Sequence, residues 1–166
     1  MSAQTLVSVE EYLHTVFDGS DREYLDGEIV ERNVGNKSHG RAQGRFIYLL
    51  SQLEKTTGIF VIPELRHKVT QTRYRIPDVA VFAKEPLSEV PDHPPLVAIE
   101  VLSPDDRIGY VVPKLDEYQR WGVQHIWLAD PEDRKLLVYG CDGLHEVEQL
   151  ELPDFGVVLS KNDIFS

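Results

Sequence analysis

The chain has 166 residues, 42% of them hydrophobic and 27% charged, which is an ordinary balance for a soluble globular protein with a real core. Its 28 acidic residues outnumber its 17 basic ones and give a formal net charge of −11, which weighs against a broadly basic nucleic-acid-binding surface but leaves room for a local basic patch. The single cysteine, Cys141, excludes an intrachain disulfide and a cysteine-based metal cage.

We expect a single cytoplasmic domain over residues 1–166. One unpaired cysteine suits a reducing compartment. Residues 1–9 lack the basic start and apolar core of a signal peptide, and no apolar run approaches the roughly 18 residues that cross a bilayer. We find no internal repeat, low-complexity segment or linker that would divide the chain.

The predicted elements follow from hydrophobic periodicity and from turn residues. Ser8 and Glu11 have the spacing of a capping box, and Asp26-Gly27 separates two short apolar runs, a strong hairpin signal. Pro113 stands where the first residue of a helix is expected. In chain order we expect a helix over 9–17, a hairpin over 24–30, a helix over 38–57, strands over 59–62, 65–70, 73–83 and 96–102, a helix over 113–122, a strand over 125–129 and a hairpin over 135–150.

This order of elements predicts the fold class. A helix, three strands, a helix and a further strand, with hairpins added at both ends, indicate an α/β (α+β) fold with a mixed sheet and helices packed on its faces.

Two acidic residues interrupt the most apolar strands. Asp78 precedes Val79-Ala80-Val81-Phe82, and Glu100 lies inside Val97-Ala98-Ile99-Glu100-Val101. An ionised carboxylate in a buried strand requires a compensating cation or hydrogen-bond donors. A shared divalent cation such as Mg²⁺ is the simplest compensation, and the Val101 carbonyl would add a third oxygen ligand if both side chains point to one face of the sheet.

These segments resemble a known family. Pro77-Asp78 followed by Glu100-Val101 looks like the signature of the PD-(D/E)XK nuclease superfamily, and nearly the whole chain is similar to its Uma branch of restriction endonuclease-like proteins. The further matching segments are Glu23-Tyr24-Leu25-Asp26-Gly27-Glu28-Ile29-Val30, Ser38-His39, Leu102-Ser103-Pro104, Lys114-Leu115 with Tyr118, and Trp127-Leu128 before Asp130-Pro131.

The resemblance implies a restriction endonuclease-like core and a catalytic set of Asp78, Glu100 and Lys114. Mg²⁺, or Mn²⁺ as a substitute, would be held by Asp78, Glu100 and the Val101 carbonyl. The lysine that the superfamily carries two residues after the glutamate is Leu102 here, and Lys114 in the first turn of the following helix is the matching position. Possible supporting residues are Glu28, His39 and Ser103.

A basic segment precedes Asp78 and supplies candidate DNA contacts, namely Arg66, Lys68, Arg73 and Arg75. If Gln71-Thr72 is a two-residue turn, Lys68 lies opposite Arg75, and like charges directly opposed destabilise a hairpin. An anion nearby would resolve the conflict. A phosphate backbone and carboxylates elsewhere in this acidic protein are the two candidates for this anion.

We therefore predict a Mg²⁺-dependent DNA endonuclease, for which a homodimer is natural because two sites cut two strands. Two alternatives stay open: a catalytically inactive nuclease-fold module that binds or regulates, and a metal-dependent hydrolase of a small phosphoester. The endonuclease hypothesis requires that Asp78 and Glu100 point to the same side of the sheet and that neither is locked to a neighbouring arginine.

Overall fold

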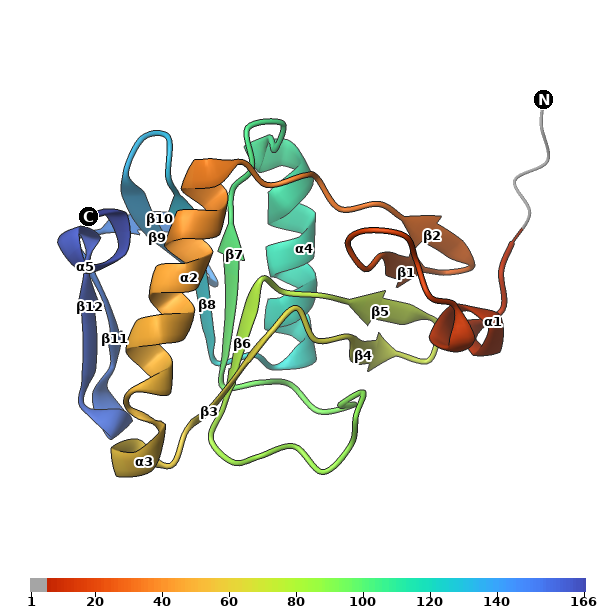
Figure 1. Cartoon of the computed structure of the whole chain (residues 1–166), viewed down its shortest axis with the longest axis horizontal. Helices are drawn as coiled ribbons and strands as arrows, with labels where there is room; N and C mark the ends of the chain where they lie inside the picture. Colours follow the sequence, from red (N-terminus) through yellow and green to blue (C-terminus); the bar gives the residue numbers. More distant parts are fainter. Residues whose placement is uncertain (1–5) are drawn as a thin grey trace.

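The computed structural model describes residues 6–166, and a six-stranded mixed sheet forms its centre (Figure 1). The strands of this sheet are β3 (Phe60–Pro63), β6 (Val79–Phe82), β7 (Val97–Val101), β8 (His125–Asp130), β9 (Lys135–Gly140) and β10 (Gly143–Val147). Their spatial order is β10-β9-β8-β7-β6-β3. The pair β7–β8 is parallel and the other pairs are antiparallel, so the predicted mixed sheet is confirmed.

Two long helices pack on opposite faces of this sheet. The helices are α1 (Val9–His14), α2 (Lys37–Ser51), α3 (Glu54–Thr57), α4 (Ile108–Trp121) and α5 (Lys161–Phe165), with a 3₁₀ turn η1 (Pro153–Phe155). Ile99 of β7 packs in one core with Phe46 of α2, whereas its neighbour Ala98 packs in another with Leu115 of α4. Because side chains alternate along a strand, Glu100 shares the Ala98 face and points toward α4.

A smaller antiparallel sheet projects to one side of the molecule, at the right of Figure 1. Its strands are β1 (Glu23–Leu25), β2 (Glu28–Val30), β4 (His67–Thr70) and β5 (Arg73–Arg75), in the order β2-β1-β5-β4. Asp26 and Gly27 have φ angles of 53° and 102°, the left-handed turn that the Asp-Gly pair predicted. Tyr12 of α1 covers this sheet, with its ring 5.1 Å from that of Tyr24 and 5.5 Å from that of Tyr74.

The predicted order of helix, three strands, helix and strand is confirmed as α2, β3, β6, β7, α4 and β8, with the β4–β5 hairpin inserted after β3. The predicted strand over 73–83 is divided, because Pro77 cannot donate to a ladder and the chain passes there from the small sheet to the large one. The helix expected over 38–57 is also divided. The Leu53 N–H donates to the Leu50 carbonyl, a tighter bond that separates α3 from α2.

The C-terminal region departs from the prediction in its last strands. The strand expected to continue to residue 150 ends at Val147 in β10, and the chain then forms β11 (Gln149–Leu152). This strand pairs with β12 (Val157–Ser160), a partner that the sequence did not signal. The β11–β12 pair and α5 pack on α2 in the same core. Over residues 6–166, the structure has no helix with both the length and the apolarity to cross a membrane.

The start of α4 corrects the role predicted for Pro113. The helix begins at Ile108, so Pro113 lies inside it and Lys114 lies in its second turn rather than its first. Val111 explains the earlier start, because it is buried on the same helix face as Leu115 and extends the apolar stripe before the proline. The first-turn position that was predicted for Lys114 is therefore wrong.

Candidate active site

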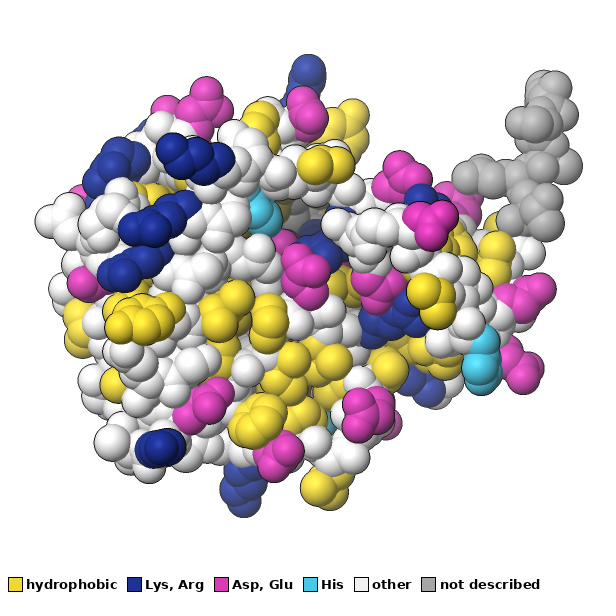
Figure 2. Space-filling model, in the orientation of Figure 1, with side chains coloured by type: hydrophobic (Ala, Val, Ile, Leu, Met, Phe, Trp, Pro, Cys, Tyr) yellow, Lys and Arg dark blue, Asp and Glu magenta, His cyan; other side chains and the backbone are white. Residues whose placement is uncertain are grey.

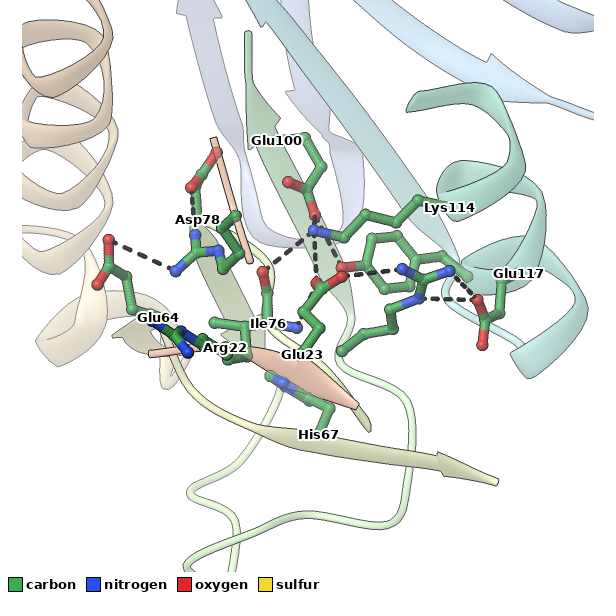
Figure 3. Close-up of polar contacts among 12 residues, drawn as sticks. Arg22, Glu23, Glu64, His67, Ile76, Asp78, Glu100, Lys114 and Glu117 are labelled. Atoms are coloured by element: carbon green, nitrogen blue, oxygen red, sulfur yellow. Dashed lines mark hydrogen bonds and ion pairs between the residues drawn. The ribbon is translucent and has the colours of Figure 1, made fainter. Parts of the chain in front are cut away.

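A cavity of about 600 Å³ lies where the large sheet, the small sheet and α4 meet. Asp78, Glu100 and Lys114 line it together, as do Glu23 of β1 and Arg32 of the segment between β2 and α2. Figure 3 shows the polar contacts that join these side chains. The three residues that the sequence proposed as a catalytic set therefore share one cavity.

Asp78 reaches the cavity from the residue before β6. Val79 pairs with Ile99, so strand alternation places Asp78 on the Glu100 face of the sheet, as the endonuclease hypothesis requires. The side chain is almost fully buried, and its Oδ2 accepts a 2.7 Å hydrogen bond from the Val101 N–H. Its Oδ1 accepts a 2.7 Å hydrogen bond from Nη2 of Arg32.

The ionised form of Asp78 is favoured in this position. Burial by itself raises the pKa of Asp78, but the hydrogen bond with His39 and the positive charges of Lys114 and Arg32 outweigh it. Together they hold the pKa of Asp78 below its ordinary value. This carboxylate is therefore charged at neutral pH.

Glu100 has the opposite electrostatic character. Its Oε1 accepts hydrogen bonds from Lys114 Nζ at 2.8 Å and from the Tyr118 hydroxyl at 2.7 Å. Burial raises the pKa of Glu100 to about 7, and the nearby negative charges of Asp78 and Glu23 act in the same direction against the attraction of Lys114. A carboxyl with such a pKa can exchange a proton near neutral pH, which is useful for acid–base chemistry.

Lys114 extends from α4 into the centre of the cavity (Figure 3). Its Nζ lies 2.8 Å from Glu100 Oε1, 2.8 Å from Glu23 Oε1 and 3.2 Å from the Ile76 carbonyl oxygen. Burial lowers the pKa of Lys114, but the carboxylates of Glu100, Glu23 and Asp78 outweigh it and raise the pKa. The structure thus brings this helix lysine to the glutamate. Leu102, which follows β7, lines the same cavity with an apolar side chain and supplies no charge.

Glu23 is a site residue that the sequence reasoning missed. It is almost fully buried, and its carboxylate accepts hydrogen bonds from the Ile76 N–H at 2.9 Å and from Arg75 Nη1 at 2.8 Å in addition to its contact with Lys114. Burial raises the pKa of Glu23, but Lys114 and Arg75 outweigh it and the pKa is lowered. Its place in the matching segment 23–30 was the one signal that could have identified it.

Arg32 is the second missed residue, and it corrects the sequence argument. The condition that neither carboxylate is locked to an arginine is not met, because Arg32 binds Asp78 directly. The buried charges of Asp78 and Glu100 are compensated separately by Arg32 and Lys114. Burial of the two carboxylates is consequently no argument for a shared metal ion by itself.

The three supporting candidates lie in different environments. His39 of α2 is buried, with Nε2 3.4 Å from Asp78 Oδ2, and its hydrogen bond with Asp78 raises the pKa of His39 despite burial. A Cβ at Gly35 would lie 2.6 Å from the His39 ring, so a glycine is required for this packing. Ser103 lines the cavity and its N–H donates to Asp106 at 2.7 Å, whereas Glu28 is exposed and lies outside the cavity.

Most of the proposed DNA contacts are engaged with acidic residues. Arg66 binds Asp21 at 2.6 Å, Arg73 binds Glu117 at 2.8 Å, and Arg75 binds both Glu23 and Glu117. The predicted pairing of Lys68 with Arg75 is wrong. A bulge between residues 68 and 70 places Lys68 opposite Tyr74, and carboxylates rather than a bound phosphate neutralise the arginines.

The donor set suits a sparsely ligated metal ion. Within residues 6–166, no three histidine, cysteine or acidic side chains are grouped to hold a metal. Asp78, Glu100 and Val101 nevertheless line one cavity. Mg²⁺ commonly binds one or two carboxylates and keeps several waters. Such binding requires Arg32 to leave Asp78, and Glu64, 3.9 Å from Arg32, is its alternative partner.

Comparisons with known proteins identify the fold and the family of this chain. A solved structure from Anabaena variabilis, described as "a putative nuclease belonging to DUF820", is 22% identical, with 96% of this chain and 97% of that chain covered and a TM-score of 0.80. This likeness shows that the chain has the restriction endonuclease-like fold. No curated protein matches the sequence. The family model described as "Uma2: Putative restriction endonuclease" matches residues 9–166, and the chain therefore belongs to the Uma2 family.

Proposed function

We propose that the protein is a Mg²⁺-dependent endonuclease that hydrolyses DNA phosphodiester bonds. The observation that carries this proposal is the meeting of Asp78, Glu100 and Lys114 in one cavity of a chain that belongs to a restriction endonuclease family. The Arg32–Asp78 ion pair breaks one condition set for the endonuclease and removes the burial argument for the metal. The proposal therefore depends on this convergence, on the family and on Arg32 leaving Asp78 when the metal binds.

The residues have distinct roles in the proposed reaction. Asp78, Glu100 and the Val101 carbonyl would hold Mg²⁺, which supplies a polarised phosphoryl oxygen and a water of lowered pKa. Lys114 Nζ, held 2.8 Å from Glu100, offsets the negative charge that develops on the phosphate. Glu100 would bind the metal in its ionised form, so its raised pKa of about 7 in the metal-free protein predicts that Mg²⁺ binding releases a proton and weakens below neutral pH.

The proposal is tested by DNA cleavage with the purified protein in Mg²⁺ or Mn²⁺. Asp78→Ala, Glu100→Ala and Lys114→Ala should each lower the rate of plasmid nicking by about 100-fold or more. Glu28→Ala is the matched control, because Glu28 is an exposed carboxylate outside the cavity. Wild-type cleavage by the Asp78 and Glu100 variants would rule out the proposed roles.

A catalytically inactive nuclease-fold module is the second candidate function. The Arg32–Asp78 ion pair favours it, since this contact neutralises a proposed metal ligand with a side chain of the protein. This function predicts no heat of Mn²⁺ binding in calorimetry. Measurable binding that Asp78→Asn abolishes would contradict it.

A hydrolase of a small phosphoester is the third candidate, and the deep burial of Asp78 and Glu100 in a cavity of about 600 Å³ favours it. Turnover of a model phosphodiester without turnover of duplex DNA would distinguish it from the endonuclease. The homodimer and the cytoplasmic location stay predictions, and sedimentation of the purified protein tests the first of them.

A further inference from the structure

Helix α2 has an unusual charge for a chain with a net charge of −11. Its 15 residues include Lys37, Arg41 and Arg45 and no aspartate or glutamate. The three cations recur every four residues, so they lie along one flank of the helix at intervals of about 6 Å. We call these three side chains the basic stripe.

The basic stripe is not neutralised by carboxylates of the described chain. Among residues 6–166, no ion pair joins Lys37, Arg41 or Arg45 to an acidic side chain, in contrast to the arginines of β5. Arg45 donates to the Asp163 backbone carbonyl at 2.8 Å and Arg41 to that of Ser166 at 3.4 Å. These bonds orient the guanidinium groups, and the nearby Asp163 carboxylate attracts Arg45 without forming an ion pair with it.

The nearest carboxylate on α5 is already engaged. Asp163 accepts hydrogen bonds of 2.7 Å from the Ser160 N–H and hydroxyl in the capping box that begins α5. Figure 2 shows dark blue side chains gathered on the side of the molecule where Figure 1 places α2 and α5. Three of the 17 lysines and arginines of this acidic protein thus lie on one exposed flank of α2.

An aromatic side chain continues the stripe. Tyr48, three residues beyond Arg45, is 55% exposed, and the Arg45 guanidinium lies 5.8 Å from the centre of its ring. Exposed aromatic rings beside cations are typical of surfaces that contact nucleic acids, because bases stack on the rings while phosphates bind the cations.

The stripe begins beside the candidate active site. His39, two residues after Lys37, reaches the cavity and lies 3.4 Å from Asp78. The cations at positions 37–45 span about 12 Å of helix axis, which matches three to four steps of about 3.4 Å along one DNA strand. His39 and Lys37 are two residues apart and face different sides of the helix, which puts the stripe on the outer flank of α2, with its Lys37 end nearest the cavity.

We propose that the basic stripe of α2 binds the phosphate backbone of the DNA that is cut in the cavity containing Asp78 and Glu100. This inference rests on the proposed nuclease function, and it replaces the β4–β5 hairpin as the principal DNA contact. Arg66, Arg73 and Arg75 are held by acidic residues, whereas the charges of α2 are available. The rest of the acidic surface confines DNA to this face.

The test is DNA binding in EDTA, so that no cleavage interferes, measured by anisotropy of a fluorescein-labelled 20-base-pair duplex. The variant Lys37→Gln/Arg41→Gln/Arg45→Gln should lose affinity by about tenfold or more. Each lost phosphate contact contributes about 0.9 to the slope of log affinity against log salt, so the slope should become shallower by about 2.7. Unchanged affinity and slope would overturn the proposal.

The matched control is Lys55→Gln/Lys84→Gln/Arg120→Gln, which changes the net charge equally at three exposed cations outside α2. It should bind as the wild type does, and an equal loss would show that no local surface is involved. The variant Arg41→Lys/Arg45→Lys keeps the charge and should keep the salt slope. If Arg41→Lys/Arg45→Lys lost as much DNA affinity as the glutamine variant, a role of charge would be refuted.

The two proposals fail in different ways. Asp78→Asn should bind the duplex like the wild type and cut nothing. If the wild type itself binds DNA but does not cut it, the result supports the stripe and removes the endonuclease. Cleavage that persists with unchanged binding in the glutamine variant removes the stripe and leaves the endonuclease. Stripe-dependent binding to phosphatidylserine vesicles, with DNA affinity unaffected, would also overturn the proposal.

Discussion

Replacing Glu23 by glutamine removes the carboxylate that joins two buried cations. Its side chain is 5% exposed and contacts Lys114 and Arg75, each at 2.8 Å. Removing one partner of a buried ion pair costs about 3–5 kcal/mol. Lys114 keeps Glu100 and Arg75 keeps Glu117, so we expect the lower end, a loss of about 3 kcal/mol in the free energy of unfolding.

Two measurements follow from this value. In urea denaturation of the metal-free protein the midpoint should fall, and the melting temperature should drop by about 6–12 °C for a domain of this size. The negative charge of Glu23 also contributes to the raised pKa of Glu100, so the substitution should lower that pKa from about 7. Carbon-13 NMR of the glutamate carboxyls measures this second effect directly.

Glu28→Gln is the control for both measurements, because Glu28 is exposed at the other end of the same hairpin. It should change the free energy of unfolding by less than about 0.5 kcal/mol. Equal destabilisation by the two substitutions, or a Glu100 pKa that Glu23→Gln does not move, would refute the view that Glu23, Lys114 and Glu100 act as one electrostatic unit.

Three further predictions concern single positions. In the folded protein the pKa of Glu100 is raised from 4.5 to about 7, so the folded state keeps a proton that the unfolded state loses. In metal-free protein the stability of the wild type relative to Glu100→Gln should therefore fall by about 3 kcal/mol as pH rises through that range. A difference in urea midpoints that does not change with pH would contradict this. Burial lowers the pKa of His67 from 6.5 to about 4. The stability of the wild type relative to His67→Phe should therefore fall by about 3 kcal/mol as pH drops through that range, and the substitution keeps a ring stacked on Phe82, 5.6 Å between centres. Parallel pH profiles of the two proteins would be inconsistent with a buried neutral imidazole. Pro113→Ala should restore a helix hydrogen bond and raise stability by about 1–3 kcal/mol, seen as a higher melting temperature, and a lower one would argue against a helix that begins at Ile108.

The proposed endonuclease and the acidic composition are reconciled by where the charges lie. Arginines that the sequence offered as DNA contacts are held by Asp21, Glu23 and Glu117, so they stabilise the small sheet and its junction with α4. The cations of α2 have no such partners in the described chain. A count of basic residues does not distinguish these two groups.

Local chemistry was enough to predict the elements and the two acidic residues. The capping box at Ser8, the Asp26-Gly27 turn and the helix end at Gly58 all have the predicted geometry. They were predictable because caps and turns depend on a few neighbouring backbone groups. Asp78 and Glu100 were recognisable because a carboxylate in an apolar strand is costly without a partner.

The partners of those carboxylates were decided by the tertiary structure alone. Arg32 and Glu23 come from segments with ordinary local patterns, and they reach Asp78 and Lys114 because the small sheet is placed against the junction of the large sheet and α4. Periodicity specifies which face of an element is buried, whereas an ion pair between distant segments depends on how whole sheets and helices pack. The sequence by itself therefore determined the fold order and the acidic residues, and the packing of the two sheets determined which cations neutralise them.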